Sequence, residues 1–139
     1  MKGFVLAAGF GTRMAPLTES VPKALIPIAT IPSIVYSLHL LKSAGITDIF
    51  VNLHYLGDQI RHTLGDGSRY GVDITYSEEP EILGTGGGLR QIAGQLDGHT
   101  LVVVNADTLF DVDLNRLIDY HLDSESIATM VLRKDPQQA

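Results

Sequence analysis

Residues 9–23 have the types and spacing that phosphate binding requires. Gly9 and Gly11 follow the apolar run 3–8, which is typical of a buried strand that opens into a tight turn. Glycines in such a turn allow positive φ and let backbone amides converge on phosphate oxygens. Arg13 and Lys23 add two cations beside the turn. The segment therefore predicts an anion site that is built mainly from backbone.

A second candidate group is acidic and lies near the end of the chain. Asp107 follows the apolar run 101–104, and a carboxylate at the end of a buried strand can hold a hard divalent cation between polyphosphate oxygens. Asp111 and Asp113 come next, and their spacing is similar to the metal motif of nucleotide-sugar glycosyltransferases. Aspartates just before a helix more often cap it. We expect Asp107 to be a metal ligand and Asp113 to be a cap.

Two familiar glycine loops do not fit the first segment. A dinucleotide fingerprint needs a third glycine where Met14 stands, and a Walker A loop needs a Gly-Lys-Ser/Thr run that the sequence lacks. The pair Gly9 and Gly11 alone is equally typical of a plain tight turn. The wider pattern around the pair must therefore identify the site.

That wider pattern resembles the signature of the sugar-1-phosphate nucleotidyltransferases. It reads Gly-Phe-Gly-Thr-Arg-Met-Ala-Pro-Leu-Thr over 9–18 and continues to Pro22-Lys23. The runs Leu-Gly-Thr-Gly-Gly-Gly at 83–88 and Val-Asn-Ala-Asp at 104–107 resemble the second and third motifs of the family, in the same order. The resemblance covers nearly the whole chain. Within the family, residues 54–88 look most similar to N-acetylmuramate-1-phosphate uridylyltransferases and mannose-1-phosphate guanylyltransferases.

The resemblance implies a reaction, a metal ion and a set of site residues. An NTP, with UTP or GTP favoured, and a sugar 1-phosphate would give an NDP-sugar and pyrophosphate with Mg²⁺. Arg13 and Lys23 would be catalytic, and Asp107 would hold the metal. The nucleotide-binding set would comprise Ala7, Ala8, Gly9, Gly11, Thr12, Arg13, Gly84, Thr85, Gly86 and Asn105.

Several alternatives stay open at this stage. The glycine run 84–88 could be a plain loop whose Thr85 caps the next helix, and Glu79 and Glu81 could be solvated loop residues or could accept a hydrogen bond from a base. A non-catalytic nucleotide-binding regulatory module of the same fold is one competing function. A glycosyltransferase that uses Asp111 and Asp113 is another.

Apolar periodicity places these residues on an alternating pattern of strands and helices. Such alternation implies right-handed crossovers and predicts a three-layer, Rossmann-like α/β fold, with a mostly parallel sheet and helices on both faces. The signature and Asp107 should meet beyond the carboxyl ends of the strands. We predict strands at 3–8, 47–53, 72–77, 100–104 and 127–132, and helices at 33–44, 56–64, 89–96 and 114–121.

Composition narrows the class of protein. The 139 residues are 45% hydrophobic and carry no long uncharged apolar run, which indicates one domain, 1–139, with no membrane span. A formal net charge of −6 without a basic cluster argues against nucleic acid or an anionic membrane as a partner. The start of the chain does not resemble an export signal, so we expect a cytoplasmic location. The absence of cysteine excludes disulfides and thiolate sites.

Members of the resembled family normally continue past the equivalent of residue 139, with a sugar-binding wall and a second acidic metal ligand. We therefore expect these 139 residues alone to bind NTP weakly and to catalyse little or no transfer. Exposed sheet edges and apolar surface predict self-association, as in a homo-oligomer.

Overall fold

The computed structural model describes residues 1–132, and a four-stranded parallel sheet with the order β5-β4-β1-β6 forms its centre. β1 (Lys2–Leu6) lies between β4 (Asp48–Leu53) and β6 (Leu101–Asn105), and β5 (Asp73–Glu78) pairs with β4. The chain moves outward from β1 to β5 and then returns to the other side of β1. The topological switch point therefore lies between β1 and β6, where ligands bind in open α/β sheets.

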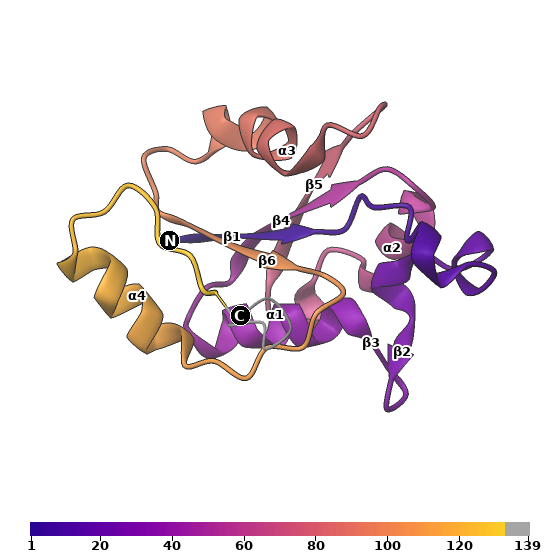
Figure 1. The fold of residues 1–139 in the computed structure, drawn as a ribbon, viewed down its shortest axis with the longest axis horizontal. Helices are drawn as coiled ribbons and strands as arrows, with labels where there is room; N and C mark the ends of the chain where they lie inside the picture. Colours follow the sequence, from indigo (N-terminus) through magenta and orange to yellow (C-terminus); the bar gives the residue numbers. More distant parts are fainter. Residues whose placement is uncertain (133–139) are drawn as a thin grey trace, which may run out of the picture.

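Helices cover both faces of this sheet (Figure 1). α3 (Gly84–Ile92) lies on one face, whereas α1 (Ser33–Ser43) and α4 (Leu114–Asp123) lie on the other. α2 (Gly57–Leu64) follows β4, and a short antiparallel hairpin of β2 (Pro27–Ile28) and β3 (Ile31–Pro32) precedes α1. The predicted three-layer, Rossmann-like fold with a parallel sheet is confirmed.

The core is divided between the two faces because side chains alternate along each strand. Phe4 and Phe50 are neighbours in the β1–β4 register and pack with Ile92 under α3. Val5 and Val51, one residue further along each strand, belong to the larger cluster on the opposite face. That cluster also contains buried residues of the other helices: Ile34, Leu38, Leu41, Ile60, Leu64 and Leu114.

The strand predicted at 127–132 is wrong. These residues have no regular secondary structure, and Ile127, Met130 and Leu132 are among the most exposed hydrophobic side chains of the described chain. An apolar run becomes a strand only where a neighbour accepts its backbone hydrogen bonds. Within residues 1–132, no strand is paired with this segment.

The helix predicted at 89–96 begins earlier than expected. α3 starts at Gly84, ends at Ile92 and is followed by a 3-10 turn at Ala93–Gln95, so the glycine run forms the first turns of a helix. Glycine lowers helix propensity, and tertiary contacts must therefore fix this start.

The loop between α2 and β5 is closed by local hydrogen bonds. Hydrogen bonds from the side chain and the backbone N–H of Ser68 lower the pKa of the Asp66 carboxyl. The Tyr76 hydroxyl donates to the carbonyl oxygen of Gly65 at 2.6 Å, and burial raises the pKa of this hydroxyl. These contacts fix the chain just before it enters β5.

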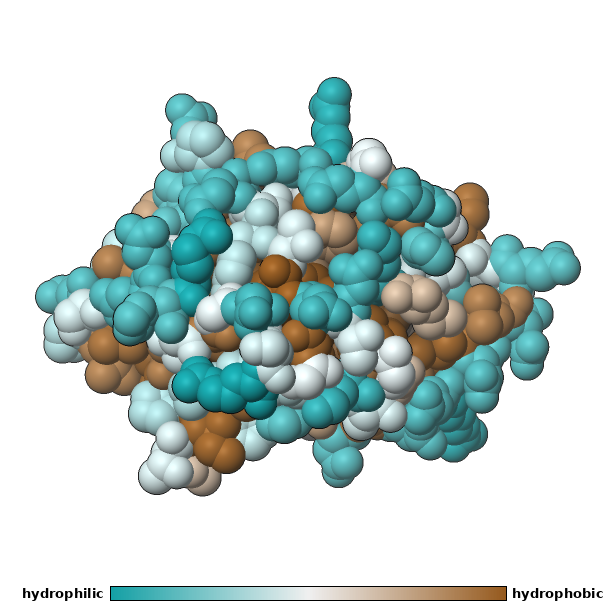
Figure 2. Space-filling model, turned by 180° about the vertical axis from the view of Figure 1, so that it is seen from behind, coloured by the Kyte–Doolittle hydropathy of each residue, from teal (hydrophilic) through white to brown (hydrophobic). Residues whose placement is uncertain are grey.

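The surface is mixed in character. Figure 2 shows hydrophilic side chains over most of the reverse face, with hydrophobic patches between them. Among the helices of residues 1–132, none combines the length and apolar character needed to cross a membrane.

Candidate functional site

The loop that follows β1 is shaped by Gly11, which has a left-handed φ of +65°. The carbonyl oxygen of Gly11 accepts a hydrogen bond from Thr18 Oγ1 at 3.0 Å. A Cβ added at Gly11 would lie 2.9 Å from Thr18 Cγ2 and 3.0 Å from Lys23 Cβ. Glycine is therefore needed both for the backbone conformation and for the close approach of Lys23.

We expect Gly11→Ala to lower the free energy of unfolding by about 2 kcal/mol, because a left-handed alanine is strained and its methyl group meets Thr18 and Lys23. Gly9→Ala is the matched control, since a Cβ at Gly9 meets no heavy atom within 4 Å. Urea unfolding of the two variants measures the difference. Equal stabilities would contradict this account of the loop.

The outer part of the loop packs on the chain that follows β4. The Phe10 ring contacts the rings of His54 and Tyr55, with centroid distances of 5.3 Å and 5.4 Å. The Tyr55 hydroxyl donates to the carbonyl oxygen of Glu19 at 3.1 Å. A hollow of about 200 Å³ lies here, lined by Phe10, Thr12, Ala15, Thr18, Glu19 and Tyr55. Arg13 is exposed, so its guanidinium is available to an incoming anion.

Lys23 and Asp107 meet across the switch point. Lys23 Nζ forms an ion pair with Asp107 Oδ2, and the two side chains remain 30% and 32% exposed. Asp107 Oδ1 also accepts a hydrogen bond from Thr108 Oγ1 at 3.3 Å. The expectation that the signature and Asp107 would meet is confirmed, and both groups remain accessible to a ligand.

Two buried serines of α1 hold the segments that carry this ion pair. Ser33 Oγ donates to the carbonyl oxygen of Ala24 at 3.0 Å, directly after Lys23. Ser37, one helical turn later, donates to the carbonyl oxygen of Asn105 at 2.9 Å. Sequence reasoning missed this role, although polar residues four apart within an apolar helix stripe were a signal for it.

A second buried network connects β1, β4 and β5 to α3. Asn52 Oδ1 accepts from the backbone N–H of Ala7 at 2.6 Å, and Asn52 Nδ2 donates to Glu79 Oε1 at 2.8 Å. Glu79 Oε2 accepts from the backbone N–H of Leu83 at 3.0 Å, just before Gly84. Asn52 and Glu79 are 4% and 3% exposed, so the interpretation of Glu79 as a solvated loop residue is wrong.

The predicted nucleotide-binding residues lie in two groups along this end of the sheet. Ala7 and Ala8 are buried where β1 ends, and Gly9 is exposed beside them. Across the network, Gly84 and the two residues that follow it are exposed at the start of α3. Asn105, the last residue of β6, is exposed. The structure therefore groups these residues around the carboxyl ends of the strands, and their contacts with a nucleotide stay predictions.

Asp111 and Asp113, the two aspartates that follow Asp107, differ in their contacts. Asp113 Oδ1 accepts from the backbone N–H of Arg116 at 3.1 Å and caps α4, as predicted. Asp111 is exposed. In the described chain, residues 1–132, no group of three or more His, Asp or Glu side chains is arranged to hold a metal ion. Asp107 could therefore supply one ligand, with the others coming from phosphate oxygens and water.

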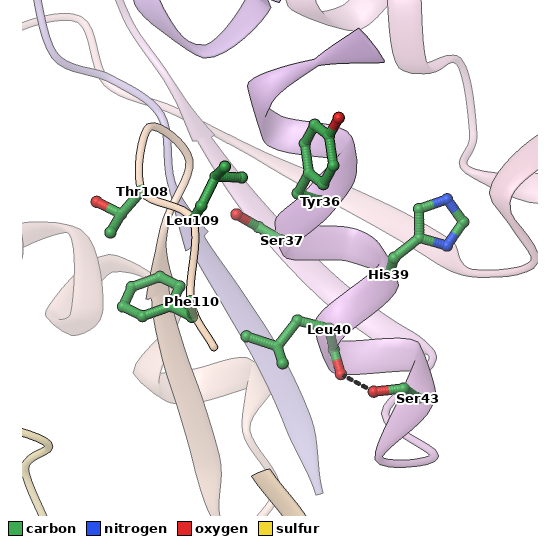
Figure 3. Close-up of a pocket in the computed structure, with 8 residues that line it drawn as sticks. All are labelled: Tyr36, Ser37, His39, Leu40, Ser43, Thr108, Leu109 and Phe110. Atoms are coloured by element: carbon green, nitrogen blue, oxygen red, sulfur yellow. Dashed lines mark hydrogen bonds between the residues drawn. The ribbon is translucent and has the colours of Figure 1, made fainter. Parts of the chain in front are cut away.

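A hollow of about 290 Å³ lies between α1 and the segment just after Asp107 (Figure 3). Its lining includes Tyr36, Leu40 and Phe110, and the Ser43 hydroxyl donates to the carbonyl oxygen of Leu40 at 2.7 Å. None of the lining residues is Lys, Arg, Asp or Glu. The hollow is thus chemically unlike a phosphate site and contains none of the predicted site residues.

A parallel α/β sheet with a glycine-shaped loop and a cation–carboxylate pair at its switch point defines a domain of the Rossmann-like fold class. The sequence model of the nucleotidyl transferase family matches residues 2–139. The chain belongs to this family.

Particular relatives carry more specific names. An N-acetylmuramate alpha-1-phosphate uridylyltransferase of Neisseria meningitidis is 50% identical over 81% of this chain and 49% of its own length. A mannose-1-phosphate guanylyltransferase of Mycobacterium tuberculosis is 38% identical over 92% of this chain and 36% of its own length. The crystal structure of HddC from Yersinia pseudotuberculosis with GMP-PN has a TM-score of 0.77 at 26% identity, covering 88% of this chain and 54% of that one. The chain spans half or less of the length of these two curated relatives.

Proposed function

We propose that the protein containing this chain transfers a nucleotidyl group from an NTP to a sugar 1-phosphate, giving an NDP-sugar and pyrophosphate. One observation carries the proposal: Lys23 and Asp107 form an ion pair beside the Gly11 loop, at the switch point of the sheet. The chain in which they meet belongs to the nucleotidyl transferase family. A cation and a carboxylate that remain accessible at this place suit a reaction between phosphates.

The chemistry needs positioning and charge stabilisation more than a covalent intermediate. An oxygen of the sugar phosphate attacks the α-phosphorus of the NTP, and the bond to the departing pyrophosphate breaks in line. The amides of the Gly9–Arg13 segment and the Arg13 guanidinium bind the β and γ phosphates and hold the pyrophosphate as it leaves. Lys23 offsets negative charge at the α-phosphate or the incoming phosphate.

Mg²⁺ fits this site through one protein ligand. The Asp107 side chain is partly exposed, and Mg²⁺ commonly uses one or two carboxylates together with substrate phosphates and water. When bound, the ion would supply positive charge to the phosphate oxygens. Lys23, the present partner of Asp107, would then be released toward a phosphate.

Base and sugar are proposed from the relatives. The higher identity is to a uridylyltransferase that acts on N-acetylmuramate 1-phosphate, so this pair is the first to test, and GTP with mannose 1-phosphate is the second. Pyrophosphate release from each NTP and sugar 1-phosphate pair, measured on the complete protein with Mg²⁺, tests the proposal. Release that depends on both substrates supports it.

Further measurements on the same protein separate the competing functions. Nucleotide binding without pyrophosphate release under any pairing would favour a non-catalytic module. Transfer of sugar from a UDP-sugar to an acceptor, with no exchange of labelled pyrophosphate into NTP, would favour a glycosyltransferase. The engagement of Asp113 as a helix cap already weakens the latter.

We expect Arg13→Ala to lower kcat/KM for nucleotidyl transfer by about 10²-fold, because a cation that faces developing phosphoryl charge is removed. The fold should persist, since Arg13 is exposed. Arg69→Ala is a control for the loss of an exposed arginine elsewhere. If the rate of Arg13→Ala stays within threefold of wild type while circular dichroism is native, the assigned role is wrong.

A further inference from the structure

We propose that Asn52 and Glu79 form a positioning pair that fixes the distance between the two walls of the nucleotide site. One wall is the chain at Ala7, and the other begins at Leu83 and Gly84. The inference rests on the proposed function, and it adds two residues that touch neither phosphate nor metal in that account. Both lie at carboxyl ends of strands, where the ligand is expected.

The pair forms one continuous chain of hydrogen bonds. The Ala7 N–H donates to Asn52, Asn52 donates to Glu79 at 2.8 Å, and the Leu83 N–H donates to the second oxygen of Glu79. Each bond has a fixed direction because the Glu79 carboxylate only accepts, whereas the Asn52 amide both accepts and donates. The two backbone segments are thereby held by the side chains between them.

The surroundings leave this pair little freedom. The Glu79 backbone N–H donates to the Leu53 carbonyl at 2.8 Å, and the Glu79 carbonyl accepts from His54 Nδ1 at 2.7 Å. On the helix side, a Cβ added at Gly88 would lie 3.0 Å from Glu79 Oε1 and 3.4 Å from Asn52 Nδ2. Gly88 therefore allows α3 to approach the pair closely, and the position of the helix depends on the pair.

The arrangement also assigns Glu79 a different task from base recognition. Both of its carboxylate oxygens already accept hydrogen bonds from protein groups, and the residue is 3% exposed. Glu79 consequently acts through Leu83 and Gly84, whose backbone it holds toward the nucleotide. Removal of the Glu79 carboxylate should therefore weaken the binding of the ground state and of the transition state by equal amounts.

Single substitutions reverse one donor or acceptor at a time. Glu79→Gln places an amide N–H₂ against the Asn52 amide or the Leu83 N–H, and Asn52→Asp places a carboxylate oxygen against Glu79. Each leaves a buried group without a matching partner. In the complete protein with Mg²⁺, we expect each to raise the KM for NTP by about tenfold with kcat changed less than threefold.

The double variant Asn52→Asp with Glu79→Gln is the decisive test. The new carboxylate at position 52 accepts from Ala7 and from the new amide at position 79, whose carbonyl oxygen accepts from Leu83. All three hydrogen bonds are restored, with only the bond between residues 52 and 79 reversed in direction, and the net charge equals that of the wild-type protein. We expect the KM for NTP to return to within threefold of wild type. Hydrogen exchange of the Leu83 amide should rise in Glu79→Gln and fall back in the double variant.

The outcomes separate this inference from the proposed function. An active enzyme whose KM is unchanged in both single variants, or is not rescued in the double variant, would refute the positioning role. Loss of melting temperature and active fraction at constant KM would show a purely structural pair and refute it as well. Wild-type protein that neither binds nor turns over NTP would refute the proposed function, and the positioning role with it.

Discussion

Replacing Lys23 with alanine should lower kcat/KM for nucleotidyl transfer by about 10² to 10³-fold, because the variant loses a cation aimed at the reacting phosphates. In the structure, Lys23 Nζ is held at the switch point by Asp107, and its backbone segment is held by Ser33. The charge is therefore positioned before any ligand arrives. Steady-state pyrophosphate release measures the loss.

The matched control is Lys2→Ala, which breaks another Lys–Asp ion pair at the opposite end of the sheet. Lys2 Nζ lies 3.1 Å from Asp48 Oδ2, where β1 and β4 begin. Loss of that pair should leave the rate within about threefold, because the pair lies at the end of the sheet opposite to the carboxyl ends of the strands. Equal losses in Lys2→Ala and Lys23→Ala would show that Lys23 acts through stability and not through charge at the site.

The central fold was predictable because its signals are local and repeated. Apolar runs such as 101–104 alternate with helical stretches, and that alternation permits few arrangements other than a parallel sheet with crossovers. Since the carboxyl ends of parallel strands share one edge, the meeting of Lys23 with Asp107 followed from the topology.

The details that were missed depend on contacts between distant segments. Nothing in the sequence distinguishes Glu79 from its exposed neighbours until Asn52 is placed 2.8 Å away by strand register. The helix was predicted to begin only at residue 89, after the glycine run, whereas in the structure it begins at Gly84, where Leu83 and Gly88 contact that same pair. Residues 127–132 have the composition of a strand. They form none in the structure, because no neighbouring strand in the described chain accepts their backbone hydrogen bonds.

The ion pair itself indicates how the site responds to a ligand. Lys23 and Asp107 neutralise one another in this structure, and each is about one-third exposed. A polyphosphate with its metal ion offers each group a partner of opposite charge, so the pair can separate without leaving a bare charge. Binding of nucleotide and binding of metal should therefore depend on one another at Asp107.

Asp107→Asn should abolish most of the Mg²⁺ dependence of nucleotide binding and lower turnover by about 10²-fold or more, because the amide keeps the shape and gives up the charge that a divalent ion requires. Metal-free nucleotide binding should change little. Calorimetric titration of NTP with and without Mg²⁺ measures the metal-dependent and the metal-free affinity.

Asp113→Asn is the matched control for this change, because asparagine caps a helix about as well as aspartate and the cap on the Arg116 N–H is retained. Its binding and turnover should stay within threefold of wild type. Equal Mg²⁺ enhancement in wild type and Asp107→Asn would refute the metal role of Asp107. A loss confined to Asp113→Asn would instead place the metal at the second acidic motif, as a glycosyltransferase requires. Because the two substitutions are identical in chemistry and lie six positions apart, a difference between them reports the place of the charge and not its mere presence.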